Sequence, residues 1–436
     1  MTSAGASSAL LTDRYELTMI DAALRDGRAL RPSVFELFAR RLPSGRRFGV
    51  VAGTGRFLEL LEGFRFADSE LSWLRDAGVV HPETIDWLAS YRFSGRIRGY
   101  REGELYFPGS PILVLDGTFA ETVVLETLAL SVYNYDSAVA SAAARMVAAA
   151  EGRPLAEMGS RRTGERSAVA AARAAYLAGF GATSNLEAGR TWGIPTMGTA
   201  AHAFTLLYDS EEEAFRAQVE ALGPGTTLLV DTYDIPSGIE TAVRVAGPGL
   251  GAIRIDSGDL APAVRAARAQ LDALGATGTR ITVTNDLDEN AIAALRGAPV
   301  DSFGVGTSLV TGSGAPAAGM VYKLVAHTDD HGTWHPVGKT SENKVTVGGR
   351  KQPVRLLRDG TATEEAIYVQ DAPIPESAEA RPLLVDLVSD GIPSRAALGA
   401  EGVAAAREHH ARAIRELPLE AFSLARGEPA LPTTYR

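Results

Sequence analysis

Residues 155–305 alternate between short β-type segments and longer helix-type segments, and this alternation limits the possible folds more than any other feature of the chain. Strands that are joined by helical crossovers run parallel to one another. Because their number approaches the eight strands of a (β/α) barrel, the sequence predicts an irregular (β/α) barrel of about seven parallel strands, with an open doubly wound sheet as the alternative. The predicted strands are residues 155–158, 183–185, 195–199, 227–231, 252–256, 280–284 and 301–305.

Polar residues follow almost every one of these strands, and their distribution separates the two architectures. A barrel carries its site on the rim that the C-terminal strand ends form, whereas an open sheet concentrates polar residues at one switch point. Nearly every predicted strand contributes here, which favours the barrel. The residues are Arg161, Arg162, Ser184, Asn185, Thr199, His202, Asp231, Thr232, Tyr233, Asp234, Arg254, Asp256, Ser257, Gly258, Asp259, Thr284, Asn285, Asp286, Gly306, Thr307 and Ser308.

The flanking segments have a different pattern, and the sequence therefore predicts three parts. Residues 1–120 begin with a helix capped by Thr12 or Asp13 and continue as strand-type segments, which indicates an α/β (α+β) domain with antiparallel strands. Residues 121–320 contain two alanine-rich helices followed by the barrel. Residues 321–436 form a C-terminal part that ends in a charged helix.

Two features of this C-terminal part are rich in cationic or imidazole side chains. Residues 339–358 have the pattern of a basic hairpin, which either binds nucleotide phosphates or is a solvated surface hairpin. The helix over residues 404–415 carries two adjacent histidines that we expect to face solvent. The side chains are Lys339, Lys344, Arg350, Lys351 and Arg355 in the hairpin, and His409 and His410 on the helix.

The composition excludes several classes of function. The formal charge is −10, from 43 Lys and Arg against 53 Asp and Glu, and without a net basic field nucleic acid is not expected as the main partner. An anionic substrate must therefore be held by local arginines and helix ends. The absence of cysteine excludes disulfides, thiol nucleophiles and Cys-ligated zinc. Neither a secretory signal nor an apolar run of about 20 residues is visible, so we expect a cytoplasmic protein without a membrane span.

His202 lies where the third predicted strand meets a helix-type segment, within the sequence GTAAHAF at residues 198–204. Free backbone N–H groups and the helix dipole favour an anion at such a point. An imidazole placed there can accept a phosphoryl group, and the helix end would stabilise the charge that arrives. The alternative is a histidine that caps or packs in a loop, since most single histidines have no catalytic role.

Ten segments spread over nearly the whole chain resemble one family in their order and joint presence. They read LLTDRYELTM, FELFARRLP, VLETLALSVYN, MGSRR, IPTMGTAAHAF, LLVDTYD, IRIDSGDL, FGVGTSLVTG, VYKLV and KTSENKVTVGGRKQPVR. The chain is similar to nicotinate phosphoribosyltransferase, a type II phosphoribosyltransferase of NAD salvage. The resemblance implies an N-terminal α/β domain onto which the C-terminal segments pack, together with an irregular (β/α) barrel.

The resemblance also implies the reaction. Nicotinate and 5-phosphoribosyl 1-pyrophosphate would give nicotinate mononucleotide and pyrophosphate, with ATP hydrolysis coupled to the transfer. The histidine of the GTxAH segment is transiently phosphorylated in this family, and that position is His202 here.

Such substrates require phosphate donors and oxygen ligands for Mg²⁺, and the chain offers both. Backbone N–H groups and hydroxyls after the last strand suit the ribose 5-phosphate. Carboxylates in the Asp-Ser-Gly-Asp turn suit Mg²⁺ and the ribose hydroxyls, because hard cations prefer carboxylate oxygen. The residues are Gly306, Thr307 and Ser308 for the phosphate, and Asp256, Ser257 and Asp259 in the turn.

Nicotinate is a flat carboxylate, which a guanidinium can pair and an aromatic ring can stack on. Arg254 and Thr199 match positions that contact nicotinate in the family, while Arg161 and Arg162 are further candidates for the carboxylate or the phosphates. Tyr15 matches a family tyrosine that stacks on the pyridine from the neighbouring subunit, which implies a homodimer with shared sites. Some family members carry a cysteine-bound zinc, which this chain without cysteines is not expected to hold.

Two other functions remain as alternatives. One is an enzyme of the same fold that uses nicotinamide, which would favour an acidic partner near the amide, or quinolinate, which does not need a phosphorylated histidine. The other is a non-catalytic ligand-binding barrel, which predicts a loss of polar residues at the strand ends. Those residues are present here.

Overall fold

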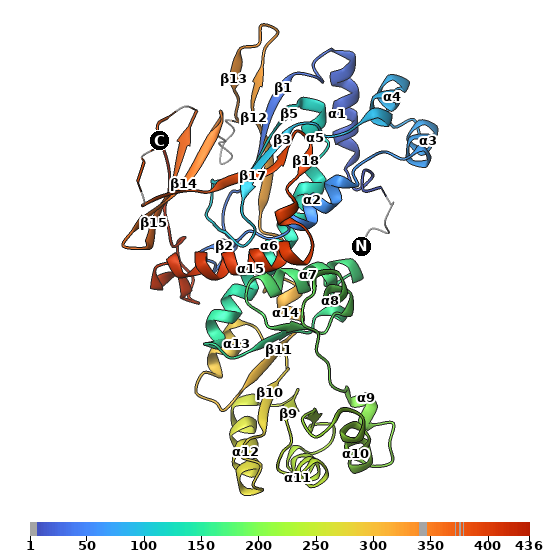
Figure 1. Cartoon of the computed structure of the whole chain (residues 1–436), viewed down its shortest axis with the longest axis vertical. Helices are drawn as coiled ribbons and strands as arrows, with labels where there is room; N and C mark the ends of the chain where they lie inside the picture. Colours follow the sequence, from blue (N-terminus) through green and yellow to red (C-terminus); the bar gives the residue numbers. More distant parts are fainter. Residues whose placement is uncertain (1–6, 340–346, 371, 375, 378) are drawn as a thin grey trace. The chain divides into compact units, whose positions relative to one another are not determined.

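The computed structural model describes residues 7–339, 347–370, 372–374, 376–377 and 379–436. The chain forms two compact units, of which the first combines residues 1–141 with 315–436 and the second is residues 142–314. The first boundary lies at residue 141, later than the predicted 120 and within helix α6 (Glu126–Ala150), which is one continuous helix in place of the two that were predicted. In Figure 1 the blue N-terminal segments and the orange and red C-terminal segments accordingly belong to one unit.

The second unit is built on a six-stranded parallel sheet in the order β7-β6-β11-β10-β9-β8. The first and last strands of the unit are neighbours, since Glu157 pairs with Val305 in the β6–β11 register. The strands are β6 (Leu155–Glu157), β7 (Ala182–Thr183), β8 (Thr227–Leu229), β9 (Ala252–Ile255), β10 (Arg280–Val283) and β11 (Ser302–Val305).

The predicted third strand, residues 195–199, does not join this sheet as a strand. It contributes a single parallel bridge between Thr183 and Thr196, because backbone pairing continues only through the bonds of Thr183 N–H to Pro195 O and Met197 N–H to Thr183 O. Within the described residues no pairing connects Thr196 with β8. The predicted irregular barrel of about seven strands is therefore not confirmed, and the parallel sheet is a half-barrel.

Helices connect successive parallel strands, and local capping residues set where several of them begin. Asn185, Ser210 and Asp234 accept backbone N–H bonds at the first turns of α8, α10 and α11, which satisfies donors that a helix start leaves free. The helices of this unit are α7 (Glu165–Leu177), α8 (Leu186–Trp192), α9 (His202–Thr205), α10 (Glu211–Leu222), α11 (Ile235–Ala246), α12 (Leu260–Ala273), α13 (Glu289–Ala294) and α14 (Thr307–Val310).

The first unit contains a seven-stranded sheet in the order β13-β12-β1-β5-β3-β17-β18. All neighbouring strands in it pair antiparallel, and three N-terminal strands form its centre with two C-terminal strands on either side. The strands are β1 (Pro32–Ala39), β3 (Arg96–Tyr100), β5 (Pro111–Thr118), β12 (Met320–Thr328), β13 (Trp334–Pro336), β17 (Leu384–Ser389) and β18 (Ile392–Pro393).

Helices with apolar faces bury one large core in this unit. Leu17, Phe57, Leu88 and Leu128 on four different helices pack with sheet residues such as Leu113, and burial of apolar area is the main favourable term in folding. The helices are α1 (Arg14–Arg25), α2 (Thr54–Glu62), α3 (Asp68–Asp76), α4 (Pro82–Ser90), α5 (Phe119–Val123), the start of α6, and α15 (Gly399–Ala413).

Two small sheets complete the first unit. One pairs β2 (Gly49–Val50) with β4 (Leu105–Tyr106), and the other has the order β16-β14-β15-β19. The chain ends in this second sheet and not in the predicted helix. Its strands are β14 (Lys351–Arg358), β15 (Thr361–Val369), β16 (Ala380–Pro382) and β19 (Thr433–Tyr435).

In the basic segment at residues 339–358, two of the described cations, Lys351 and Arg355, differ from both interpretations given above. Lys351 is buried and its Nζ lies 2.6 Å from Glu36 Oε2, while Arg355 is fully buried and contacts Glu365 Oε2 at 2.6 Å. Arg350 pairs with Asp116. Lys351 and Arg355 are therefore bound by buried carboxylates of the same unit, whereas the Arg350 side chain is 41% exposed and Lys339 is exposed as well. Lys344 lies outside the described residues.

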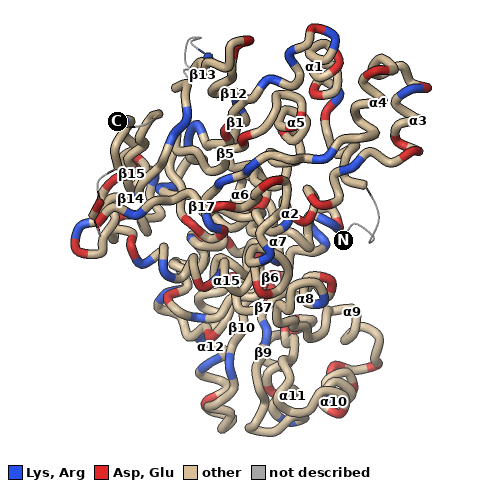
Figure 2. Tube along the Cα trace, turned by 45° about the horizontal axis from the view of Figure 1, so that its top comes forward, with Lys and Arg blue, Asp and Glu red and all other residues tan. Residues whose placement is uncertain are grey.

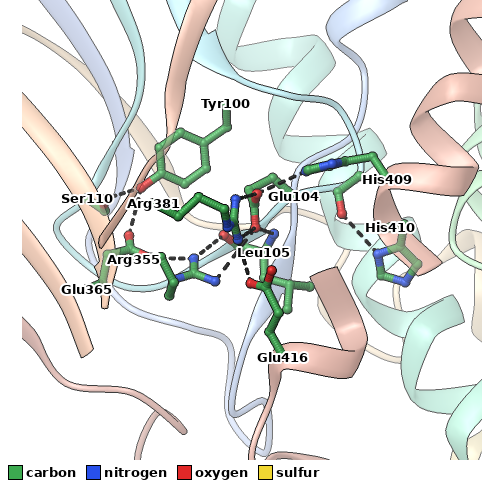
Figure 3. Close-up of polar contacts among 11 residues, drawn as sticks. Tyr100, Glu104, Leu105, Ser110, Arg355, Glu365, Arg381, His409, His410 and Glu416 are labelled. Carbon is green, nitrogen blue, oxygen red and sulfur yellow. Dashed lines mark hydrogen bonds and ion pairs between the residues drawn. The ribbon is translucent and has the colours of Figure 1, made fainter. Parts of the chain in front are cut away.

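A buried polar network centred on Glu104 contacts both the four-stranded sheet and α15 (Figure 3). The Glu104 carboxylate accepts a hydrogen bond from Arg381 Nη1 at 2.6 Å and interacts with His409 Nε2 at 2.9 Å. Arg355 Nη1 lies 3.6 Å from Glu104 Oε1. Burial alone would raise the pKa of Glu104, but the His409 bond and the two guanidinium charges lower it well below its usual range.

The expectation that His409 and His410 face solvent is therefore wrong. His410 is 5% exposed and its Nδ1 lies 3.0 Å from the carbonyl oxygen of Gly103. Gly103 has a φ of +89°, and a Cβ at this position would lie 2.4 Å from the Ala406 carbonyl oxygen of α15. Glycine thus permits the close approach of the loop to the helix, which buries a histidine that helical periodicity alone places on a polar face.

Charged residues of both signs are interspersed along the trace of each unit (Figure 2). Among the described residues, no helix combines the length and the apolar character that crossing a bilayer requires.

From the burial of His410 we predict that the free energy of unfolding depends on pH. Burial lowers the pKa of His410 to about 4, below the unfolded value, so between these values the unfolded chain binds more protons and stability falls as the pH falls. From pH 7 to pH 5 we expect this histidine to remove about 2 kcal/mol from the free energy of unfolding. His410→Asn, which keeps an N–H donor without the charge, should show a shallower loss.

Urea unfolding at a series of pH values measures this dependence, with His331→Asn, a change at an exposed imidazole, as the matched control. Equal pH slopes for wild type and His410→Asn would contradict the assignment.

Candidate functional site

A cavity of about 390 Å³ lies at the C-terminal ends of the parallel strands and is lined by residues of the second unit alone. Its lining combines cationic, carboxylate and hydroxyl side chains with glycines, so it offers both charge and backbone donors to a ligand. The lining residues are Met158, Arg161, Arg162, Ser184, Met197, Gly198, Thr199, Ala200, Ala201, Arg254, Asp256, Thr284, Asn285, Asp286, Gly304, Gly306 and Thr307.

Arg254, on β9, is the most enclosed cation of the cavity. Its Nη1 donates to Thr199 Oγ1 at 2.9 Å, which fixes the guanidinium against the segment that leads to His202. Burial lowers the pKa of Arg254, and the charge of Arg161 adds to the lowering, while Asp256 and Asp231 oppose it. Two cations that repel each other in a partly buried cavity favour an anion between them.

Arg161 and Arg162 belong to a short 3₁₀ turn, residues Ser160–Arg162, that follows β6. Both side chains are exposed to the cavity. Asn185 ties this turn to the next strand, because its Nδ2 donates to Ser160 Oγ at 3.0 Å while its Oδ1 caps α8. The arginines thus project from an anchored turn.

Asp256 and Asp231 occupy neighbouring strand ends and are bound differently. Asp256 Oδ1 accepts a hydrogen bond from the Thr284 hydroxyl at 2.6 Å. Its other oxygen, Oδ2, lies 3.9 Å from His202 Nε2. The Asp231 side chain is 1% exposed, and its Oδ2 accepts bonds from the Asp256 N–H at 2.8 Å and the Ser257 hydroxyl at 2.7 Å. Its Oδ1 has no hydrogen-bond partner in the described chain.

His202 begins the short helix α9 and lies beside these two carboxylates. Its Nδ1 is 3.1 Å from Thr232 Oγ1, and its Nε2 is 4.0 Å from Asp231 Oδ1 and 3.9 Å from Asp256 Oδ2. The side chain is 41% exposed, so one ring nitrogen is held by a hydroxyl while the imidazole stays accessible. This is the arrangement of an oriented imidazole and not of one that packs in the core.

Gly306 connects β11 with α14, which begins at Thr307, and the two residues are called the Gly306 turn below. The backbone at Gly306 packs closely on the β6 side, since a Cβ built on Gly159 would lie 3.0 Å from the Gly306 carbonyl oxygen. Ser308 belongs to the same short helix and its carbonyl accepts the Ser313 N–H at 2.6 Å. Ser308 is not among the residues that line the cavity.

The remaining predicted site residues lie elsewhere. Asp259 is exposed at the start of α12 and Ser257 is exposed next to Asp231, and neither lines the cavity. Tyr15 belongs to the first unit and is 45% exposed. Burial and the neighbouring Glu126 raise the pKa of Tyr15 to about 12, so its ring is neutral at physiological pH.

The donor set has only a partial fit to a magnesium ion. The described residues contain no cluster of three or more carboxylate or imidazole groups that would enclose a metal. Mg²⁺, however, is commonly held by one or two carboxylates together with substrate phosphates. Asp256 meets that requirement because it lines the cavity, whereas Asp259 does not line it.

Asp231 and Glu157 were assigned no role from the sequence, although both contribute to the geometry of the site. Asp231 follows a predicted strand, so its position among the rim residues was visible, but its burial between His202 and Asp256 was not. Glu157 was included within the predicted strand 155–158. The available signal was a carboxylate in an otherwise apolar strand.

Cationic, carboxylate and hydroxyl side chains that converge on the C-terminal ends of parallel strands define an enzyme-type anion site of the β/α class. The comparisons with known proteins identify the class further. Residues 10–134 match the family model of the nicotinate phosphoribosyltransferase (NAPRTase) N-terminal domain.

Two relatives and one solved structure agree with this match. The chain is 59% identical to nicotinate phosphoribosyltransferase pncB1 of Mycobacterium tuberculosis, covering 97% of this chain and 94% of the relative. It is 40% identical to nicotinate phosphoribosyltransferase of Bacillus subtilis, covering 83% and 76%. The crystal structure of human nicotinic acid phosphoribosyltransferase superposes with a TM-score of 0.80 at 26% identity, covering 97% of both chains. The chain belongs to the nicotinate phosphoribosyltransferase family of enzymes.

Proposed function

We propose that this protein transfers a phosphoribosyl group from 5-phosphoribosyl 1-pyrophosphate to nicotinate in NAD salvage, with release of pyrophosphate and coupling to ATP hydrolysis. The observation that carries the proposal is the pairing of a partly buried arginine, Arg254, with Thr199 at a cavity that also holds Arg161 and Arg162. A guanidinium whose charge is disfavoured by burial and by another cation gains most from a carboxylate ligand.

The transfer breaks one bond and forms one bond at the anomeric carbon. The bond to pyrophosphate breaks and pyrophosphate leaves with the electron pair, while the lone pair of the pyridine nitrogen forms the new C–N bond. Arg254 and Thr199 would orient the nicotinate, and Arg161 and Arg162 would hold the departing pyrophosphate. Positive charge develops on the sugar, which the carboxylate of Asp256 can stabilise without reacting.

The phosphate at the other end of the substrate needs donors that are fixed in place. The turn at Gly306 and Thr307 provides a backbone N–H and a hydroxyl at the cavity wall. Mg²⁺, when bound, supplies charge neutralisation among the phosphates, and Asp256 is the residue that would hold it. Neither the ion nor the nucleotide is required for Arg254 to recognise nicotinate.

His202 would carry the ATP coupling. A neutral imidazole nitrogen attacks the γ-phosphorus of ATP, the bond to ADP breaks, and ADP leaves with the electron pair; water later releases phosphate from the phosphohistidine. The 3.1 Å contact with Thr232 supports this role because it holds one ring nitrogen and orients the other. A phosphoryl group near Asp231 and Asp256 adds negative charge beside the substrate cavity, and this can change the affinity for phosphoribosyl pyrophosphate.

A homodimer would complete the site. Tyr15 is 45% exposed, and apolar side chains near His202 are exposed as well, with Leu206 at 63%, Leu207 at 76% and Tyr233 at 62%. Exposed apolar surface beside a functional site is characteristic of an interface. The proposal is that Tyr15 of one subunit stacks on the pyridine bound by another.

The direct test is formation of nicotinate mononucleotide from nicotinate and phosphoribosyl pyrophosphate, with and without ATP. Parallel assays with nicotinamide and with quinolinate separate the related activities. A protein that binds nicotinate but forms no product from any of the three would be a non-catalytic binding protein.

Arg254→Ala should weaken nicotinate binding more than phosphoribosyl pyrophosphate binding. Loss of a charge-assisted contact costs roughly 1.5–3 kcal/mol, about ten- to a hundredfold in affinity. Steady-state KM values for both substrates measure the effect. Arg190→Ala removes an exposed arginine of the same unit that pairs with Glu187 and serves as the control. An unchanged KM for nicotinate in Arg254→Ala would remove this residue from the carboxylate pocket.

His202→Ala should fold, should not be labelled by γ-labelled ATP and should lose ATPase activity. Because the residues assigned to the transfer remain, slow formation of nicotinate mononucleotide should persist at a rate that ATP does not change. Label incorporation and product formation are measured on the same preparation, with His331→Ala as the control. Normal labelling of His202→Ala would place the phosphoryl acceptor on another residue.

Mixing Tyr15→Ala with Asp256→Ala should restore activity that each variant lacks. A mixed dimer contains one site with neither change, so random exchange should recover about a quarter of wild-type activity. The measurement is activity against time after mixing, with subunit exchange followed by mass spectrometry. Extensive exchange without recovery would show that Tyr15 does not act in the neighbour's site.

A further inference from the structure

Glu157 places a buried carboxylate at the end of β6, next in the chain to Met158, which lines the cavity. The residue is 0% exposed. Its Oε2 accepts a bond from the Thr183 hydroxyl at 2.5 Å and its Oε1 accepts the Gly159 N–H. Burial raises the pKa of Glu157, and the two bonds oppose the rise. A carboxylate in this position is costly, and an apolar side chain would fill the space without that cost.

The two bonds connect strand ends that carry different parts of the site. Glu157 pairs with Val305 of β11 on one side and with Thr183 of β7 on the other. Val305 is followed directly by Gly306. The carboxylate therefore lies where three neighbouring strands end, between the turn after β6 and the turn after β11.

The contact with Gly159 determines how the turn after β6 leaves the sheet. Gly159 packs so closely that a Cβ there would lie 2.3 Å from Val310 Cγ1 and 3.0 Å from the Gly306 carbonyl oxygen. Holding the Gly159 N–H thus fixes the distance between the two turns. The next residues are Ser160–Arg162, so the same bond sets the start of the segment that carries Arg161 and Arg162.

Thr183 completes the arrangement on the other side. Its hydroxyl oxygen accepts the Asn185 N–H at 2.9 Å, so its proton is available for Glu157. Asn185 in turn bonds Ser160 at 3.0 Å. The turn Ser160–Arg162, called the arginine turn below, is consequently held at its start, through Gly159 and Ser160, by one connected set of bonds. Buried sets of this kind are sensitive to the loss of one member.

We propose that Glu157 is a positioning residue that fixes the spacing between the arginine turn and the Gly306 turn. The ligand that spans these two turns is one with anionic groups at both ends, and under the proposed function, on which this inference rests, it is phosphoribosyl pyrophosphate. Nicotinate, held by Arg254 and Thr199, does not span them. Glu157 therefore sets the affinity for the sugar substrate selectively.

The test is Glu157→Gln, which keeps the shape and one acceptor oxygen but presents an amide N–H₂ group to one of the two donors. Thr183→Val removes the opposite partner. Calorimetry measures Kd for phosphoribosyl pyrophosphate, and steady-state kinetics give KM for both substrates. Glu187→Gln, at an exposed carboxylate of the same unit, is the matched control.

Each single variant should raise Kd and KM for phosphoribosyl pyrophosphate about tenfold or more, with a much smaller change in KM for nicotinate. The double variant should be less than additive, because both changes break the same contact. If Glu157→Gln fails to fold, the Kd and KM of Thr183→Val for phosphoribosyl pyrophosphate test the inference without it.

Unchanged affinity for phosphoribosyl pyrophosphate would overturn the inference. Equal loss of both substrates together with a lower Tm would also overturn it, because that is the effect of a purely structural residue. A wild-type protein that binds phosphoribosyl pyrophosphate but forms no nicotinate mononucleotide would count against the proposed function alone. The role of Glu157 would still be tested by comparing Kd for phosphoribosyl pyrophosphate between the wild type and Glu157→Gln.

Discussion

The pairing of β6 with β11 is the interaction on which the rest of the second unit, residues 142–314, depends. It places the first strand of the parallel sheet beside the last, with Glu157 opposite Val305. Residues about 150 positions apart in the chain thereby meet at one end of the sheet, and parallel strands deliver their C-terminal ends to the same side. The arginine turn and the Gly306 turn are neighbours only because of this pairing.

Electrostatics then decides what the cavity can hold. Its cations are Arg161, Arg162 and Arg254, and the carboxylates nearest to them are already engaged, since Asp256 is bonded to Thr284 and Asp231 to the next turn. The carboxylates thus orient backbone and hydroxyl groups without forming close pairs with the arginines. Charge that internal pairs do not neutralise remains for an anionic ligand.

The sequence predicted the parallel strands and the polar rim because both depend on local pattern. Strand and crossover periods are visible in a single chain, and residues that follow each strand must reach the same edge. Burial of long-range pairs was not predictable in this way. Lys351 and Arg355 read as surface charges, yet Glu36 and Glu365 bind them across strands. His410 read as exposed, yet the loop at Gly103 covers it.

The parallel sheet has six strands where an irregular barrel of about seven was predicted, and this difference bears on how the site works. Residues 195–199 have the composition of a strand but make one bridge only, so the sheet stays open between Thr196 and β8, and the connection across that opening carries His202. Arg254 and the two turns are fixed by strand pairing, whereas His202 starts a helix of four residues. Among the described residues its side chain forms one hydrogen bond, with Thr232, and the carboxylates of Asp231 and Asp256 lie 4.0 and 3.9 Å away. A residue that gains and loses a phosphoryl group must accommodate a change of about two charges. The fold thus places Arg254 and the two turns on paired strands, and it places Thr199 and the proposed phosphoryl acceptor in a segment that the sheet ladder does not constrain.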